Sequence, residues 1–282
     1  MFILDIMYVV VDIGGTKTLV AVFDDAGQLG QTVKFPTDTS SYPGFLKSLS
    51  SQLATLELAT KPTMAAVAIP GRVDRTSGVG LDFGNLPWEN VPIKADVEAL
   101  LGCPVIVEND ANVAGLSEAL LVSGEFKKVL YVTISTGIGT GLIINGIIDP
   151  DFADSEGGHM ILEHDGKMVT WESFASGKTI VQRYGKKASE ITDPAIWKLL
   201  AHDFTLGLLD LTALLQPQII IIGGGVGSHF ERFGAFLQAE LEQYASPLVP
   251  TPVLREAKHA EEAVIYGCYE LIKQVERGQA AS

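Results

Sequence analysis

A strand followed by a glycine turn and a second strand occurs twice in this chain, once near its start and once near its middle. The apolar run at residues 8–13 has the length of a buried strand and ends in two glycines, and residues 19–23 are expected to return as its hairpin partner. The run at 129–134 leads into the glycine-rich turn 135–141 and a further apolar stretch. Duplicated lobes leave weak internal similarity of this kind. The pattern therefore predicts two lobes built on one plan.

Elsewhere in the chain, helical and strand patterns alternate, which is typical of an α/β fold. Residues 72–92 are expected to be rich in loops. The expected helices cover residues 43–58, 93–101, 111–122, 194–215, 230–244 and 260–276, and the further expected strands cover residues 64–69, 104–107 and 219–222. No low-complexity linker separates the two halves, so the lobes should share a broad, hinge-like junction.

The composition is that of a folded globular chain and excludes several classes of partner. Of the 282 residues, 47% are hydrophobic and 19% are charged, so the chain can bury a large core and is not disordered. The chain has 20 Lys and Arg residues and 34 Asp and Glu residues, which gives a formal net charge of -14. A field of that sign repels nucleic-acid phosphates and anionic lipids. Neither nucleic acid nor a membrane is an expected partner.

The two cysteines and the first residues predict the compartment. Cys103 and Cys268 lie far apart in the sequence, which indicates neither a disulfide framework nor a zinc cluster and fits a reducing cytoplasm. Residues 1–11 are apolar enough to suggest a signal peptide, but Asp5 interrupts them and no basic segment precedes them. We therefore expect a cytoplasmic, soluble protein.

Three of the strand-like runs end in glycine clusters, at Gly14, at Gly137 and at residues 223–225. Glycine lets backbone N–H groups approach an anion, so each cluster could hold phosphate oxygens, although a tight turn alone would explain any one of them. Asp12 strengthens the first cluster, because a carboxylate at a strand end can hold hydrated Mg²⁺ beside phosphates. A dinucleotide fingerprint is the rival interpretation of the third cluster, but Ser228 stands where its third glycine belongs.

Four segments taken together resemble the motifs of the ROK family of sugar kinases. They are Asp-Ile-Gly-Gly-Thr-Lys at 12–17, Glu-Asn-Asp-Ala-Asn at 108–112, Ser-Thr-Gly-Ile-Gly-Thr-Gly at 135–141 and Glu-Gly-Gly-His at 156–159. The segments occur in the family's order and at comparable spacings, and the similarity covers nearly the whole chain. The combination is far more selective than any one segment.

The resemblance implies a fold and a division of the chain. The fold is a two-lobed actin-like ATPase fold, in which a ribonuclease H-like α/β core is duplicated and the active site lies in the cleft between the lobes. Residues 1–112 would form the N-terminal lobe, with the C-terminal helix 264–282 packing back on it, and residues 113–263 would form the C-terminal lobe. A homodimer is expected from the family alone.

The resemblance also implies ATP and Mg²⁺ as cofactors and assigns residues to them. Asp12 would hold the Mg²⁺ ion, through water. The first phosphate loop would contain Asp12, Gly14, Gly15, Thr16 and Lys17, the second Thr136, Gly137, Gly139 and Thr140, and the segment against adenosine Gly223, Gly224 and Gly225.

Asp110 is the candidate general base. A sugar hydroxyl is a poor nucleophile at neutral pH, and a carboxylate within hydrogen-bond reach can orient it and accept its proton while the γ-phosphoryl group transfers. The rival interpretation is that Asp110 caps the helix beginning at Ala111. Spacing alone supports the two roles equally, the resemblance favours catalysis, and one side chain can do both.

The residues that would bind the sugar also follow from the resemblance. Glu156 and His159 match the substrate motif, although an isolated Glu or His is usually a solvated surface group. Carboxylates suit such a site because they are strong acceptors for several hydroxyls. The full candidate set is Gly71, Asn85, Asn109, Asp110, Glu156, His159 and Glu172.

The chain departs from the family pattern after His159. Many relatives place a Cys-x-Cys-Gly-x-x-Gly-Cys zinc cluster there, whereas residues 160–171 contain no cysteine. His164 and Glu163 lie nearby, but histidines without thiols are poor material for a closed tetrahedral zinc site. No structural zinc is expected. Packing from Phe152, Met160 or Trp171 would then have to place His159.

These observations predict an ATP-dependent hexose kinase, with glucose phosphorylated at the 6-hydroxyl. Fructose and N-acetylated hexosamines such as N-acetylmannosamine or N-acetylglucosamine are alternative substrates. The ROK family that the chain resembles also includes DNA-binding regulators, which carry a helix-turn-helix segment before the first glycine turn. Only 11 residues precede Asp12 here, which argues against that alternative. A sugar-binding sensor without turnover is a third alternative, but Asp12, Lys17 and Asp110 are all present.

Overall fold

The computed structural model of the chain describes residues 6–58, 60–84, 86–259 and 262–279. The chain divides into two compact units. Unit 1 contains the residues up to Ala114 and those from Val264 onward, and unit 2 runs from Gly115 to Ala263. Among the described residues, no helix has both the length and the apolar character needed to cross a membrane.

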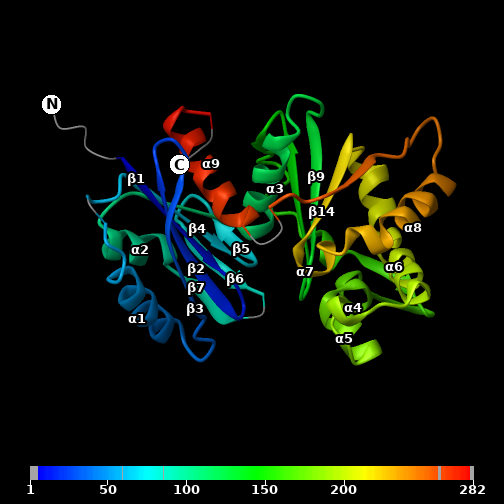
Figure 1. The fold of residues 1–282 in the computed structure, drawn as a ribbon, viewed down its shortest axis with the longest axis horizontal. Coiled ribbons are helices and arrows are strands. Elements are labelled where there is room, and N and C mark those ends of the chain that lie inside the picture. The colour runs from blue at the N-terminus through cyan, green and yellow to red at the C-terminus, as the bar shows by residue number, and fades with distance from the viewer. Residues whose placement is uncertain (1–5, 59, 85, 260–261, 280–282) are drawn as a thin grey trace. The chain divides into compact units, whose positions relative to one another are not determined.

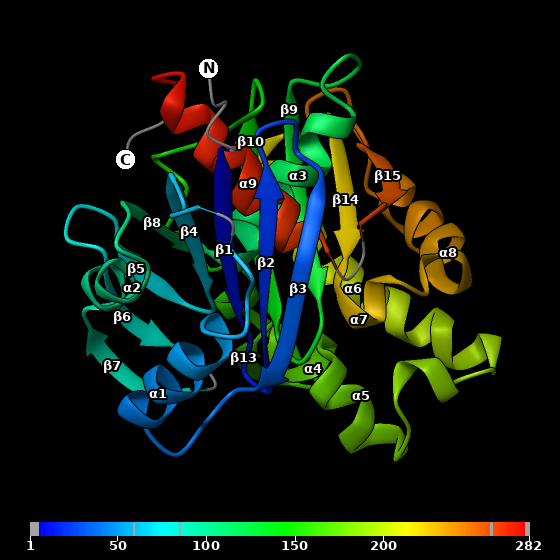
Figure 2. The same cartoon turned by 60° about the vertical axis from the view of Figure 1, so that its left-hand side comes forward.

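A mixed five-stranded sheet forms the centre of unit 1, in the order β3-β2-β1-β4-β8 (Figures 1 and 2). Its strands are β1 (Met7–Ile13), β2 (Lys17–Asp24), β3 (Leu29–Pro36), β4 (Met64–Ile69) and β8 (Val105–Asn109). The first three strands are antiparallel neighbours, whereas β1, β4 and β8 run parallel. The carboxyl ends of the three parallel strands therefore meet at one edge of the sheet.

Helices cover both faces of this sheet. On one face, α1 (Tyr42–Leu53) and α2 (Ile93–Leu101) contribute Phe45, Leu49 and Val97 to the buried cluster under the strands. On the other face lie α3 (Asp110–Leu121) and α9 (Ala263–Glu276), where the ring of Tyr269 stacks on that of Phe23 at 5.0 Å. Capping residues define two of the helix ends: Ser41 caps the N-terminus of α1, and Gly102, at φ +67°, ends α2.

A second, small sheet in unit 1 corrects the sequence prediction of a loop-rich segment at 72–92. It contains β5 (Arg72–Asp74), β6 (Val79–Phe83) and β7 (Leu86–Val91), joined in that order. The strands are three to six residues long, too short for a clear periodic signal, and two register shifts interrupt their pairing. Burial of Phe83, Leu86 and Trp88 holds this sheet against the core.

Unit 2 repeats the plan of unit 1, as the sequence predicts. Its central sheet has the order β11-β10-β9-β14-β15, again with three antiparallel strands followed by parallel pairing. The strands are β9 (Lys128–Ile134), β10 (Ile138–Ile144), β11 (Ile147–Ile148), β14 (Ile219–Gly223) and β15 (Val253–Glu256). The all-isoleucine run of β14 is fully buried, which is typical of a central parallel strand.

The remaining elements of unit 2 cover its sheet. Two long helices, α6 (Pro194–Leu215) and α8 (Phe230–Gln243), lie beside this sheet (Figure 1). Trp197 and Phe204 of α6 and Phe233 of α8 share one buried cluster with residues of β9 and β14. The helices are α4 (Glu172–Ala175), α5 (Gly177–Tyr184), α6 (Pro194–Leu215), α7 (Gly224–Gly227) and α8 (Phe230–Gln243). A two-stranded hairpin, β12 (Ile161–His164) with β13 (Lys167–Thr170), and the short 3-10 helices Gly157–His159 and Ala188–Glu190 complete the unit.

Helices α3 and α9 pack unusually closely within unit 1. Gly267 of α9 lies against the backbone of α3, where a Cβ atom would come within 1.7 Å of the Val113 carbonyl oxygen. Only glycine allows this approach, because neither helix backbone can give way as a flexible side chain can. Since α3 begins at Asp110, the contact also supports the element that carries the candidate base.

We expect the change Gly267→Ala to lower the free energy of unfolding by about 2 kcal/mol, because overpacking a tight contact typically costs this much. Helix propensity acts in the opposite direction and favours alanine by roughly 1 kcal/mol. Urea titration measures the difference. The matched control is Gly124→Ala, where a Cβ would meet nothing within 4 Å. A stability gain in Gly267→Ala would contradict the packing argument.

Candidate active site

The first glycine turn connects β1 to β2 and presents backbone rather than side chains. The N–H of Gly14 donates to the Lys17 carbonyl at 3.0 Å. A Cβ on Gly14 would lie 2.9 Å from that same oxygen, so a larger residue would force the turn open. Thr16 and Lys17 are exposed on it. The predicted first phosphate loop is thus a tight turn with accessible polar groups.

Sequence reasoning missed Thr37, which supports this turn from below. Its hydroxyl donates to the Gly14 carbonyl at 2.7 Å, and the hydroxyls of Thr37 and Thr18 lie 2.9 Å apart. Its N–H donates to the Thr16 carbonyl at 3.1 Å. Thr18 and Thr37 are buried, so these bonds are shielded from water. A threonine after a polar edge strand gives no signal in the sequence that would identify this role.

Asp12 lies near the carboxyl end of β1, in register with Ala68 of β4, which in turn pairs with Glu108 of β8. Burial raises the pKa of Asp12 to about 6, and the nearby charges of Lys17 and Lys34 oppose that rise. At neutral pH the carboxylate is still ionised. Carboxylate oxygen is the donor that Mg²⁺ prefers, so the chemistry of Asp12 fits the predicted metal.

The segment from Glu108 to Asn112 joins β8 to α3, and its hydrogen bonds show which residue caps α3. The side-chain oxygen of Asn109 accepts the N–H of Ala111 at 2.8 Å and that of Asn112 at 3.2 Å, which is the geometry of an N-cap. Asp110 is the first residue of α3, and its carboxylate accepts only the Ala111 N–H of these two, at 2.7 Å. Capping of α3 therefore depends mainly on Asn109.

An ion pair between a partly exposed arginine and a buried glutamate fixes this segment, and sequence reasoning did not anticipate it. Arg75 binds the Glu108 carboxylate with two nitrogens, at 2.6 and 2.7 Å. The same carboxylate accepts the Asn109 N–H at 2.7 Å and the Asn112 side-chain amide at 3.0 Å. Bidentate, charge-assisted bonds of this kind are strong and directional. They hold the residues on both sides of Asp110.

The predicted sugar loop of unit 1 is partly described. Gly71 follows β4 at φ +96°, and a Cβ there would lie 2.5 Å from the Asp82 carbonyl oxygen, so this position requires glycine. The Asn109 side-chain amide donates to the Gly71 carbonyl at 2.9 Å. Gly71 and Asn109 are thus brought together, whereas Asn85 lies outside the described residues.

Three carboxylates converge at this edge of unit 1. Burial raises the pKa of the Cys268 thiol in α9 well above its usual value, and the negative charges of Asp12, Glu108 and Asp110 raise it further. All three acids therefore lie close enough to one buried sulfur to act on it. Ligands of open α/β sheets bind at the carboxyl ends of the strands, which is where these acids lie.

The second glycine turn, in unit 2, connects β9 to β10. The Ser135 carbonyl accepts the Gly177 N–H at 2.7 Å, and the Ser135 N–H donates to the Gly137 carbonyl at 2.9 Å. Thr136 is exposed between them. The turn is therefore anchored to the start of α5 while its tip remains accessible, as a phosphate loop requires.

Thr140 holds the segment that contains Glu156 and His159. Its hydroxyl accepts the Gly157 N–H at 3.1 Å, and the residue is buried. A Cβ on Gly158 would lie 2.1 Å from the Ile138 carbonyl oxygen, so both glycines of the motif lie directly on β10. This contact places Thr140 beneath the predicted sugar motif; its assignment to the phosphate loop stays a prediction.

Glu172 and His159 lie side by side at the end of unit 2 that carries the second turn. The nearest nitrogen of His159 is 3.9 Å from the Glu172 carboxylate, whose other oxygen accepts the Ile138 N–H at 3.3 Å. The His159 side chain is 64% exposed and that of Glu172 is 32% exposed, so both can reach a ligand. The structure thus brings together two sugar-binding candidates predicted from different motifs.

The third glycine cluster follows β14. A Cβ on Gly223 would lie 2.2 Å from the Tyr131 hydroxyl, and one on Gly224, at φ +84°, would lie 2.5 Å from the Thr133 hydroxyl. Local packing therefore explains these two glycines. A Cβ on Gly225, by contrast, would meet no other atom within 4 Å. Gly225 is exposed, so its backbone is accessible from solvent.

The hairpin β12–β13 occupies the place where the zinc cluster of the family would follow His159. Across the described ranges, no group of three or more His, Cys, Asp or Glu residues is arranged to hold a metal ion. Trp171 is fully buried and Met160 packs on the same cluster, whereas Phe152 is 39% exposed. Which of these residues places His159 stays a prediction.

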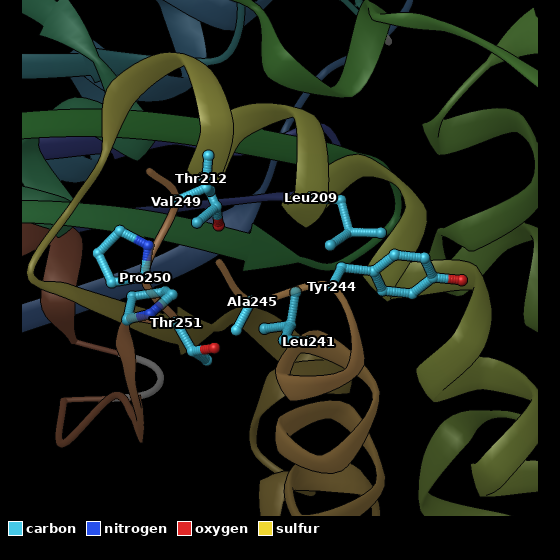
Figure 3. Close-up of a pocket in the computed structure, with 9 residues that line it drawn as sticks. Leu209, Thr212, Leu241, Tyr244, Ala245, Val249, Pro250 and Thr251 are labelled. Carbon is cyan, nitrogen blue, oxygen red and sulfur yellow. The ribbon is translucent and has the colours of Figure 1, made fainter. Parts of the chain in front are cut away.

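Unit 2 also has a small, open pocket between α6, α8 and the segment before β15 (Figure 3). Its lining is mainly apolar and includes Leu209, Leu241 and Val249. None of its lining residues belongs to the predicted site, so the pocket does not alter the assignments above.

With this geometry in place, comparisons with known proteins identify the family. The model of the ROK family matches residues 8–275. A glucokinase of Streptomyces coelicolor is 30% identical over 258 residues, covering 77% of this chain and 81% of that protein. An N-acetyl-D-glucosamine kinase of Salmonella gallinarum is 30% identical over 302 residues, covering 93% and 97%.

A solved structure of a ROK family protein is also similar to this chain. The ROK family glucokinase from Streptomyces griseus, in complex with glucose and AMPPNP, superposes with a TM-score of 0.80 at 25% identity, covering 95% of this chain and 99% of that one. The chain belongs to the ROK family, and its relatives place it among the sugar kinases of that family. Its fold is the two-lobed actin-like ATPase fold.

Burial of an ionised Asp12 should cost stability at neutral pH. The folded-state pKa of Asp12, about 6, lies above the ordinary value of 3.8, so folding favours the protonated carboxyl. The stability that protonation adds to the folded state is lost as the pH rises through 6. In metal-free buffer at pH 8, Asp12→Asn should therefore raise the free energy of unfolding by roughly 2 kcal/mol. Urea titrations should show this gain shrinking toward pH 4. A gain that is independent of pH, or equal in the exposed-site control Asp210→Asn, would contradict the assignment.

Proposed function

We propose that the protein transfers the γ-phosphoryl group of ATP to a hexose, with glucose phosphorylated at its 6-hydroxyl. The observation that carries the proposal is the start of α3, where Asn109 caps the helix and the Arg75–Glu108 pair holds the segment. Asp110 is half-buried in this rigid setting. A carboxylate that the fold does not need as its main cap, held by buried neighbours, is suited to a catalytic role.

Asp110 acts as the general base in this proposal. Its carboxylate orients the sugar hydroxyl and accepts its proton as the oxygen forms a bond to the γ-phosphorus, while the bond from that phosphorus to the β–γ bridging oxygen breaks in line and ADP leaves. Asp110 stands in the first turn of α3, where the helix dipole is favourable to a negatively charged side chain. Phosphoryl transfer depends mostly on positioning, which a base on a capped helix provides.

The nucleotide would be held by backbone at the glycine turns. Asp12, Gly14, Gly15, Thr16 and Lys17 would bind phosphates from unit 1. In unit 2, the phosphate contacts would come from Thr136, Gly137, Gly139 and Thr140, and the adenosine contacts from Gly223, Gly224 and Gly225. Mg²⁺, when bound through water at Asp12, would neutralise charge on the β- and γ-phosphates.

The sugar would be held by polar groups from the ends of both sheets. In unit 1, Asn109 and the backbone at Gly71 would contact it, and Asn85 is assigned the same role from the sequence. In unit 2, Glu156, His159 and Glu172 would accept or donate hydrogen bonds to its hydroxyls. The proximity of His159 to Glu172 supports a shared role for the last two.

An N-acetylated hexosamine is the second candidate substrate. The N-acetyl-D-glucosamine kinase relative matches a larger share of this chain than the glucokinase relative, 93% against 77%. N-Acetylmannosamine and fructose remain further alternatives, and a sensor without turnover is less supported. We also propose that the protein is cytoplasmic and a homodimer, on family resemblance.

A panel of sugars tests the substrate assignment. Glucose, fructose, N-acetylglucosamine and N-acetylmannosamine are each supplied with ATP and Mg²⁺, and ADP release is followed by a coupled assay. The highest kcat/KM is expected for glucose. A higher value for an N-acetylated sugar would overturn that choice, and sugar binding without ADP release from any of the four would support the sensor instead.

The change Asp110→Asn should lower kcat by roughly 100-fold or more, because it removes the base and keeps the shape. Sugar binding, measured by calorimetry, and the unfolding midpoint should change little, since Asn109 still caps α3. Asp210→Asn, which changes an exposed acid on α6, serves as the matched control and should retain full turnover. Unchanged kcat in Asp110→Asn would refute the role of Asp110.

A further inference from the structure

A buried carboxylate in the middle of α6 lies outside every predicted site. The side chain of Asp203 is only 6% exposed, and an uncompensated charge at that depth would be strongly destabilising. Arg183 of α5 pairs with one carboxylate oxygen at 2.6 Å, and His164 of β12 lies 3.3 Å from the other. Three elements that are distant in sequence therefore meet at Asp203.

The contact with His164 fastens the β12–β13 hairpin to the helical layer. The imidazole stacks on the ring of Phe174 at 4.1 Å with an interplanar angle of 12°. Stacking sets the plane of the ring, and the carboxylate of Asp203 sets the direction of its nitrogen. The hairpin follows His159 directly, so a shift of β12 would move His159 with it.

Trp171 connects the same helix position to Glu172. Its indole N–H donates to the main-chain carbonyl of Asp203 at 3.1 Å. Its ring packs so closely on Gly207 that a Cβ there would lie 2.2 Å from it. Its backbone N–H donates to the Met160 carbonyl at 2.9 Å. Trp171 thus binds α6 on one side and the residue after His159 on the other, and Glu172 follows it in the chain.

We propose that Asp203 is a positioning residue for sugar binding, whose carboxylate sets the places of His159 and Glu172 through His164 and Arg183, while Trp171 bonds to the main-chain carbonyl of the same residue. The inference rests on the proposed function of those two residues and adds the group that orients them. Side chains that bind substrate are held in place by partners behind them. For residues that ligate a metal, losing such a partner typically costs 10- to 100-fold in affinity or activity.

The charge of Asp203 matters for this role as well as its shape. An amide in its place could still accept one hydrogen bond, but it would leave the Arg183 guanidinium without a counterion and make both contacts weaker. His159 and Glu172 contact the sugar in both the ground state and the transition state. Misplacing them should therefore raise the KM for sugar and leave kcat little changed.

The test compares Asp203→Asn with two variants. In Asp203→Asn the KM for sugar should rise about 10-fold, while kcat and the KM for ATP stay within about threefold of the wild type. Asp203→Glu retains the charge and should recover part of the loss. The matched control is His202→Gln, which changes the preceding residue of α6, where an exposed imidazole contacts Glu240.

Each outcome decides the inference. A folded Asp203→Asn enzyme with an unchanged KM for sugar overturns it, and so does an equal rise in the KM for ATP, which would indicate a general structural loss. If Asp203→Asn does not fold, Arg183→Gln, at a side chain that is 33% exposed, and His164→Gln decide it by the same criteria.

The test separates this inference from the proposed function. If the wild type phosphorylates no sugar in the panel, the proposed function fails. Calorimetric titration of the wild type and Asp203→Asn with glucose and N-acetylglucosamine then still measures the effect on sugar binding. Equal affinities in the two proteins, or no binding to the wild type, would overturn the role of Asp203.

Discussion

Each unit of this protein holds a buried carboxylate that is paired with an arginine and placed behind groups assigned to the ligand. In unit 1, Glu108 binds Arg75 and the residues flanking Asp110. In unit 2, Asp203 binds Arg183 and His164 behind the segment of His159 and Glu172. A buried charge is costly unless its geometry is satisfied, so each pair permits few arrangements of the chain around it. Removing one partner of either pair should displace the neighbouring groups assigned to the ligand, whereas the reacting groups themselves would remain.

The repeated sheet explains why the polar residues gather where they do. In each unit the parallel strands end at one edge, and residues at or just beyond those strand ends lie together there: Asp12, Gly71 and Asn109 in unit 1, and the turns after β9 and β14 in unit 2. This is the edge at which open α/β sheets bind ligands. A single strand plan, used twice, therefore supplies two glycine turns from distant parts of the sequence.

Much of this arrangement could be predicted from the sequence, where local chemistry is strong. The buried runs of β1, β9 and β14 and the helix 194–215 have clear periods, and the structure places them at nearly the predicted bounds. The strand β3 was missed because it is a mostly exposed edge strand with polar residues. The helix α3 was predicted one residue late, since Asn109, not Asp110, is its main cap. Thr37 and Asp203 gave no signal because their partners are distant in sequence, and no local pattern records such contacts.

The hairpin after His159 has a consequence for how the protein responds to oxidising conditions. Thiolates that hold a zinc ion can be converted to disulfides or sulfenic acids, with loss of the metal. A carboxylate, a guanidinium and an imidazole undergo no such reaction, and residues 160–171 contain no thiol. Cys103 and Cys268 are both buried. Peroxide or disulfide stress that would release zinc from a cysteine cluster therefore finds no thiol in the segment 160–171 that follows the predicted sugar motif.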